Sequence, residues 1–149
     1  MVPRAFIPLT NDAFFHVFFA RHETLLLRML EAVLGREIES LTVLNPQLAG
    51  EVSSSKVIVL DVLAKLGDGT QVNLEVQVEA PDGLEPRFVF YCARGYTKQL
   101  LRGEDYTELQ ASVLVVWKVK PLFAEVEAFH SVYELRERKT GRLFSEALA

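Results

Sequence analysis

Hydrophobic and polar residues alternate along the middle of the chain in a pattern that predicts two strands joined by a tight turn. Residues 57–66 and 70–79 are both rich in Val, Ile and Leu and are bounded by turn-forming residues. Residues 67–69, between them, are Gly-Asp-Gly, which places glycine where a hairpin loop needs a positive φ. Closing this loop pairs Leu66 with Thr70, so we expect an antiparallel hairpin in that register.

This register places Asp61 directly opposite Glu75, because the turn fixes the pairing of a hairpin. Since side chains alternate along a strand, one hairpin face is wholly apolar and is expected to point into a core. Its residues are Ile58, Leu60, Val62, Ala64, Val72, Leu74, Val76 and Val78. The other face is mixed and carries Asp61, Asn73, Glu75, Gln77 and Glu79 among Val57, Val59 and Leu63.

Two carboxylates that face each other repel, so Asp61 and Glu75 require a stabilising partner. A divalent cation between them is the physical explanation that fits best. The alternative is a strand face in contact with water, which alternating polar residues usually indicate in an antiparallel sheet. The apolar neighbours of Asp61, namely Val57, Val59 and Leu63, favour a partly covered face. Spacing alone leaves both interpretations open.

The remaining segments predict an α/β or α+β sandwich with helices flanking a mixed sheet. Helices are expected from Thr10-Asn11-Asp12 through the aromatic run, over 22–34 with Gly35 as its end, and over 87–102. Strands are expected at 38–44, at 112–119 and, as an edge strand, at 126–136. The helix at 87–102 is expected to connect two strands of one sheet by a right-handed crossover.

The helix predicted at 87–102 carries a line of basic residues. At about 100° per residue, five side chains fall within a sector of roughly 80°. They are Arg87, Tyr91, Arg94, Lys98 and Arg102. The opposite arc is expected to face the sheet with Phe88, Val89, Cys92, Ala93, Tyr96 and Leu100. A basic stripe with an interleaved tyrosine suits a helix lying along a phosphate backbone, whereas a solvated face of an ordinary amphipathic helix is the simpler alternative.

Composition limits the class of protein. A length of 149 residues fits one domain, either alone or as the N-terminal part of a longer protein. No stretch approaches the roughly 18 apolar residues of a membrane span and no signal peptide is evident, so we expect no membrane partner. The single cysteine, Cys92, fits a cytoplasmic location. The net charge of −4 does not favour nucleic-acid binding, although a local basic stripe can act within an acidic protein.

The usual short motifs of other site classes are absent from the sequence. His16, His22 and His130 lack the spacing of a zinc site, and no Gly-rich phosphate loop, nucleophile elbow or CxxC pair occurs. The Phe-rich run at 14–19 is expected in the core, with a partner-binding surface as the alternative.

The order and spacing of these residues resemble the PD-(D/E)XK nuclease superfamily, in which a strand ending in Asp is followed by a strand bearing Glu-x-Lys. Asp61, Glu75 and Gln77 stand at those positions. Two departures are Leu60, where proline is usual, and Gln77, where lysine is usual. Over residues 9–119 the chain is more similar to the family of recombination-promoting nucleases and transposases within that superfamily.

That family shows an Asp before an aromatic-rich helix, a Glu-x-Gln variant, an Arg followed by a Tyr on the next helix, and Gly-x-x-Tyr before an apolar strand. The matching residues here are Asp12 with Phe14, Phe15, Phe18 and Phe19, then Glu75 with Gln77, Arg87 with Tyr91, and Gly103 with Tyr106. One departure is His16, where the family more often has lysine.

The resemblance implies a restriction-endonuclease-like core and a Mg²⁺- or Mn²⁺-dependent endonuclease that cleaves double-stranded DNA in recombination or mobile elements. It implies Asp61 and Glu75 as metal ligands, the carbonyl of Val76 as a further ligand, and Asp12 and Gln77 as further catalytic residues. Since glutamine brings no positive charge, catalysis would lean on the metal and nearby arginines. The alternatives are an inactive nuclease-fold module that binds DNA or a protein, and an interaction domain that forms a homodimer through the Phe-rich helix.

Overall fold

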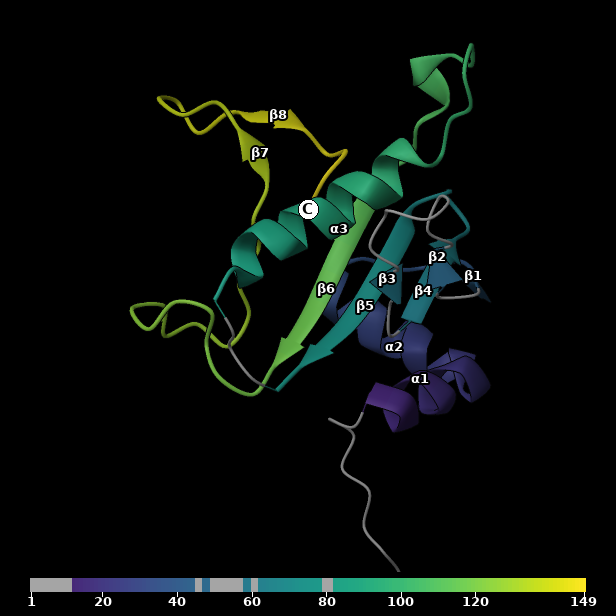
Figure 1. Cartoon of the computed structure of the whole chain (residues 1–149), viewed down its shortest axis with the longest axis vertical. Coiled ribbons are helices and arrows are strands. Elements are labelled where there is room, and N and C mark those ends of the chain that lie inside the picture. The colour runs from purple at the N-terminus through teal and green to yellow at the C-terminus, as the bar shows by residue number, and fades with distance from the viewer. Residues whose placement is uncertain (1–11, 45–46, 49–57, 60–61, 79–81) are drawn as a thin grey trace, which may run out of the picture.

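Four strands form the central sheet of the computed structural model, which describes residues 12–44, 47–48, 58–59, 62–78 and 82–149 (Figure 1). They are β1 (Leu41–Leu44), β4 (Val62–Leu66), β5 (Gln71–Gln77) and β6 (Ser112–Lys118), in the order β1-β4-β5-β6. The β1/β4 and β4/β5 pairs are antiparallel and the β5/β6 pair is parallel, so the sheet is mixed, as predicted.

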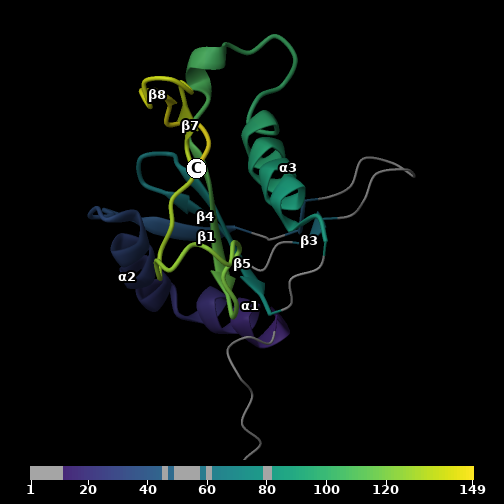
Figure 2. The same cartoon turned by 90° about the vertical axis from the view of Figure 1, so that its left-hand side faces the viewer.

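Helices cover both faces of this sheet. On one face lie α1 (Asp12–Arg21) and α2 (Glu23–Leu34), and on the other lies α3 (Leu84–Thr97) (Figure 2). The small elements are β2 (Gln47–Leu48) paired with β3 (Ile58–Val59), the 3₁₀ turn η1 (Tyr106–Glu108), and β7 (Leu135–Arg136) paired with β8 (Leu143–Ser145). No helix within the described ranges is long and apolar enough to cross a membrane.

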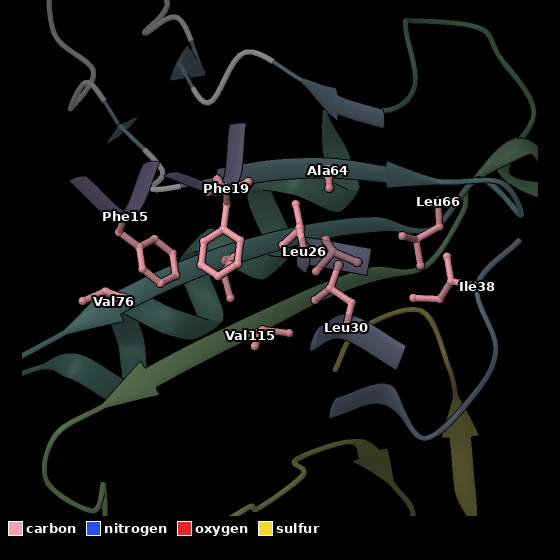
Figure 3. Packing of buried hydrophobic residues seen from close by; sticks show 12 residues of the cluster. Phe15, Phe19, Leu26, Leu30, Ile38, Ala64, Leu66, Val76 and Val115 are labelled. Carbon is pink, nitrogen blue, oxygen red and sulfur yellow. The ribbon is translucent and has the colours of Figure 1, made fainter. Parts of the chain in front are cut away.

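The hydrophobic core lies between the sheet and the α1–α2 pair. Phe15 and Phe19 of α1 and Leu26 and Leu30 of α2 are almost completely buried. They pack against alternate residues of the strands, among them Ala64, Leu66, Val76 and Val115 in Figure 3. The same cluster includes Val62, Val72 and Leu74. The Phe-rich run therefore contributes to the core, as expected, and the predicted apolar hairpin face is confirmed at Val62, Ala64, Val72, Leu74 and Val76.

The hairpin between β4 and β5 has the predicted register. Val62 pairs with Leu74 and Ala64 with Val72, and the backbone N–H of Leu66 donates to the carbonyl of Thr70 at 2.9 Å. Gly69 adopts a φ of +91°, which supplies the positive φ that the loop requires. Asp61 lies outside the described residues, so its pairing with Glu75 stays a prediction.

Helix α3 connects β5 to β6, which pair in parallel, so both ends of the predicted crossover lie in one sheet. The helix begins and ends earlier than the predicted 87–102. It includes Pro86 because proline is tolerated in the first turn, where its missing N–H would have no intrahelical partner. It ends at Thr97, and the side chain of Gln99 then exchanges two hydrogen bonds of 2.9 Å with the backbone of Gln110 just before β6.

The predicted edge strand at 126–136 is wrong, because only Leu135 and Arg136 are in a strand, and they pair with β8. Alternating polarity indicates a strand-like face but does not supply the partner that must hydrogen-bond with it. Instead, the last residues lie beside β6: Ser112 N–H donates to the carbonyl of Ala147, and Leu114 N–H to that of Ala149, each at 2.8 Å.

Candidate functional site

The face of β5 that meets α3 is polar and buried. Asn73 and Glu75 are 0% and 3% exposed, while Val72, Leu74 and Val76 point into the core on the opposite face. The prediction of a covered mixed face is therefore confirmed at these positions, and the alternative of a solvated strand face is wrong there. Burying an ionised carboxylate is costly unless a charge or hydrogen-bond donors compensate for it.

Arg87 of α3 is the residue that reaches this carboxylate. Its Nη2 lies 3.4 Å from Oε2 of Glu75, and its Nη1 lies 3.4 Å from Oε1 of Gln77. Its Nε donates a 2.9 Å hydrogen bond to the hydroxyl of Tyr91, whose ring centroid is 5.1 Å from the guanidinium carbon. A single guanidinium thus contacts both side chains of the Glu-x-Gln motif and is held by the tyrosine one helical turn away.

The geometry of the Arg87–Glu75 pair is loose. Charge-assisted N–H···O contacts are usually about 2.7–2.9 Å, which is shorter than the observed 3.4 Å. The Glu75 side chain is 4% exposed, whereas that of Arg87 is 39% exposed, so the arginine lies at the edge of the site with access to solvent. Because its guanidinium reaches solvent at the edge of the site, Arg87 is able to contact a second anion there in place of Glu75.

The orientation predicted for the basic stripe is confirmed at Cys92 and wrong at Val89. Cys92, expected to face the sheet, is buried together with Leu84 and Gly95, whereas Val89, expected on the same side, is 67% exposed. The stripe instead divides into two parts. Arg87, Tyr91 and Arg94 are partly buried, whereas Lys98 follows the helix as its exposed C-cap and Arg102 is exposed beyond it. The prediction assumes that the apolar arc packs on an apolar sheet face, but this face carries a buried acid that pairs with Arg87.

Close packing at Gly95 fixes α3 against the sheet. A Cβ atom at this glycine would lie 2.9 Å from Oγ of Ser112 and 3.1 Å from Nδ2 of Asn73. Next to it, the Ser112 hydroxyl donates to the carbonyl of Cys92 at 3.1 Å, and the Cys92 thiol donates to the carbonyl of Ser112 at 3.0 Å. Burial raises the pKa of the Cys92 thiol, so it is held neutral as a structural group.

Two further polar groups lie inside the seam between α3 and the sheet. Neither amide atom of Asn73 has a hydrogen-bond partner among the described residues, and the same holds for the buried Nε of Arg94. Most buried polar groups in proteins are paired, so unpaired ones call for an explanation. Their presence beside Glu75 shows that the interior of the seam is polar as well as closely packed.

The remaining predicted site residues are placed as follows. Asp12 is the first residue of α1, and the structure describes its backbone only. Val76 points its side chain into the core, so only its backbone can contribute to the site. Within the described part of the chain, no three His, Cys, Asp or Glu side chains cluster to hold a metal. Of the three carboxylates predicted from the sequence, Glu75 alone has a described side chain.

The donor chemistry around Glu75 fits a hard divalent cation. Magnesium prefers carboxylate and carbonyl oxygens and keeps several of its own waters, so one or two protein carboxylates are sufficient. Glu75 supplies a buried carboxylate, and the carbonyl of Val76 is a donor of the same class. Asp61, which lies outside the described residues, is the further ligand that the sequence predicts.

The sequence pattern does not single out Lys118, which the structure brings to this site. In the parallel β5/β6 register, Lys118 pairs with Gln77, and Val116 pairs with Glu75. The pairing of strands so far apart in sequence does not follow from the local pattern of either strand. Aligning the two predicted strands in parallel, with their apolar residues on one face of the sheet, would have been the signal for the position of Lys118.

Comparison with known proteins identifies the family. The chain matches the PD-(D/E)XK nuclease family transposase over residues 9–149, while no curated protein and no solved structure matches it. The mixed four-stranded sheet with flanking helices agrees with the restriction-endonuclease-like α/β fold expected for this family. The family implies DNA as the substrate, and nucleases of this type generally use divalent metals. The chain therefore belongs to the PD-(D/E)XK nuclease family transposases.

Proposed function

We propose that this protein is a Mg²⁺- or Mn²⁺-dependent endonuclease that hydrolyses phosphodiester bonds of double-stranded DNA in recombination or transposition. The observation that supports it best is the buried Glu75 beside Gln77, with Arg87 in contact with both. As part of this proposal, residues 1–149 act as one nuclease domain in the cytoplasm, which the single, neutral thiol of Cys92 supports.

In the proposed site, Asp61 and Glu75 hold the metal together with the carbonyl of Val76, and Asp12 assists as a further catalytic residue. When bound, the metal would polarise the scissile phosphate and lower the pKa of a coordinated water. Gln77 orients the attacking water through its side-chain amide. Because that amide is neutral, stabilisation of the additional negative charge in the transition state depends on cationic side chains nearby.

Arg87 has two roles in this proposal. Without metal it compensates the charge of Glu75 across the 3.4 Å contact between the two side chains. With a divalent cation bound at Glu75, the guanidinium of Arg87 would be able to contact a phosphate oxygen, for which its planar set of donors is well suited. Tyr91 holds the Arg87 side chain in position through the hydrogen bond that its hydroxyl accepts from Nε.

The rest of the basic stripe would contact DNA outside the reaction centre. Lys98 and Arg102 are exposed near the C-terminal end of α3, and Arg94 is partly buried between them and the site. Lysine and arginine contacts of this kind bind phosphate without reading the base sequence. They add affinity that falls with salt concentration.

A cleavage assay tests the proposed function. Supercoiled, linear and single-stranded DNA would be incubated with Mg²⁺ or Mn²⁺ and the wild type, Glu75→Gln, Gln77→Ala, or the exposed control Glu108→Gln. We expect the wild type and the control to cleave duplex DNA, Glu75→Gln to be inactive, and Gln77→Ala to be slower by about 10²-fold. Arg87→Ala should lower the cleavage rate more than it lowers DNA affinity.

The second candidate is a nuclease-fold module that binds DNA or a protein without cleaving it. The neutral Gln77 and the existing compensation of Glu75 by Arg87 favour it, since neither requires a metal. If the wild type is inert on every DNA form with both metals and still binds DNA, the module replaces the nuclease as the explanation. Restored cleavage in Gln77→Lys would show that the inactivity comes from that position.

A further inference from the structure

Lys118 lies beside Gln77 at the end of the parallel strand pair. The two residues are register partners, and the N–H of Val119 donates to the carbonyl of Gln77 at 3.4 Å. Adjacent strands are separated by about 4.8 Å, so side chains of register partners on one face occupy neighbouring space. Lys118 therefore begins one strand away from Gln77, the position at which the wider superfamily pattern Glu-x-Lys has its lysine.

The side chain of Lys118 is on the same face of the sheet as Glu75. Val113 and Val115 of β6 pack on the core side, so the alternate positions of this strand face α3. The hydrogen bond from the Ser112 hydroxyl to the Cys92 carbonyl of α3 confirms this orientation, and Lys118 follows Ser112 by an even number of positions. Lys118 is also only partly exposed, as a residue at the rim of a covered site would be.

The neutral side chain of Gln77 in the Glu-x-Gln motif indicates a role for the positive charge of Lys118. The guanidinium of Arg87 contacts the motif and is shared between Glu75 and Gln77. A lysine ammonium is a compact charge on a flexible stem, which suits contact with a phosphate oxygen or a reacting water. Since Gln77 is neutral, a second cation on the same face would supply the charge that this position lacks.

We propose that Lys118 is a catalytic residue that provides, from β6, the positive charge missing at Gln77, by contacting the scissile phosphate or the attacking water. This inference rests on the proposed function and adds a residue to it. The competing explanation is that Lys118 only protects an open strand edge, because the C-terminal residues hydrogen-bond to β6 near Ser112 and Leu114, and edge lysines discourage strand pairing between molecules.

Single-turnover cleavage separates the two explanations. Lys118→Ala should lower the rate by about 10²-fold, whereas the matched control Lys120→Ala, at an exposed position two residues further on, should cleave as the wild type does. Melting temperatures of both variants serve as the check on folding. Adding Gln77→Lys to Lys118→Ala should restore the rate, because the charge returns to the same space from the neighbouring strand. Equal rates for the two lysine variants, or failure of Gln77→Lys to restore cleavage, would overturn the proposal.

DNA binding keeps the inference testable if the wild type does not cleave. An inert wild type contradicts the proposed nuclease, and binding of phosphate by Lys118 can still be measured from the salt dependence of DNA affinity in Mg²⁺. Removing one cation that binds a phosphate reduces the slope of log K against log salt by about one. That reduction in Lys118→Ala and not in Lys120→Ala supports phosphate binding by Lys118, and an unchanged slope overturns it.

Discussion

Arg87 of α3 pairs with the buried carboxylate of Glu75 in β5, with 3.4 Å between Nη2 and Oε2. The pair joins the helix to the strand at the point where the family motif lies. A cation that compensates a buried acid in this way also competes with any metal for it. The pair therefore bears on stability and, in the function proposed above, on metal affinity and cleavage.

Removing Arg87 should destabilise the metal-free protein, because the buried carboxylate of Glu75 would lose the guanidinium that contacts it. We expect Arg87→Ala to lower the free energy of unfolding by about 2 kcal/mol, less than for a fully buried pair because the arginine is partly exposed to solvent. Urea unfolding of Arg87→Ala, Glu75→Gln and the double variant gives the coupling energy. If the double variant is no more stable than Arg87→Ala, removal of the Glu75 charge does not offset the loss of Arg87. The two side chains are then not energetically coupled.

Metal binding should stabilise the folded state through Asp61 and Glu75. With Mg²⁺ at about tenfold its Kd, the melting temperature of the wild type should rise by about 4 °C. Glu75→Gln and Asp61→Ala should abolish this rise, whereas the exposed control Glu108→Gln should keep it. Identical shifts in the wild type and in Asp61→Ala would exclude a shared metal site. Asp61→Asn should also leave the metal-free protein folded, since it removes one of two like charges.

The exposed end of the basic stripe should contribute affinity for DNA without sequence preference. Replacing Lys98 and Arg102 with Ala should weaken binding to all duplex sequences alike, and the salt slope should fall by about one for each phosphate that is no longer bound. Lys139→Ala, an exposed basic position in the turn between β7 and β8, is the matched control. A slope unchanged from the wild type would place the DNA on another surface.

The buried thiol of Cys92 should make stability depend on pH in the alkaline range. Because burial raises the pKa of this thiol, the folded protein keeps the proton at pH values where the unfolded chain has released it. The stabilisation is complete below the ordinary thiol pKa of about 8.5 and is lost as the pH rises through the higher pKa of the folded state. Unfolding between about pH 8 and pH 10 should show a steeper decline of stability in the wild type than in Cys92→Ala, and parallel curves would contradict this.

The part of the fold that is predictable from the sequence rests on local rules. The Gly-Asp-Gly loop fixes which residues pair, so the register from Val62 with Leu74 down to the turn follows from counting. The apolar residues beside Asp61 indicate a covered face, and the burial of Glu75 agrees with that. Both predictions use information contained in neighbouring residues.

The predictions that are wrong concern contacts between distant segments. The rotation of α3 depends on the charge of Glu75 on another element, which an apolar arc on a helical wheel does not include. The pairing of Gln77 with Lys118, about which the sequence pattern makes no prediction, depends on the parallel register of two strands joined by a long crossover. The segment at 126–136 has strand-like alternation, but Phe129 and Val132 are exposed and lie outside the strands that the structure describes.

The narrow gap at Gly95 has a consequence for how this nuclease can change during evolution. Arg87 lies eight residues away on the same helix, a separation of about 12 Å along the axis. A side chain at position 95 would have to displace the Ser112 hydroxyl and the Asn73 amide, and any shift of the stiff helix that accompanied this would also move the guanidinium relative to Glu75. Natural variation at this one position would thus alter the contact between Arg87 and Glu75 while the residues of the Glu-x-Gln motif stay the same.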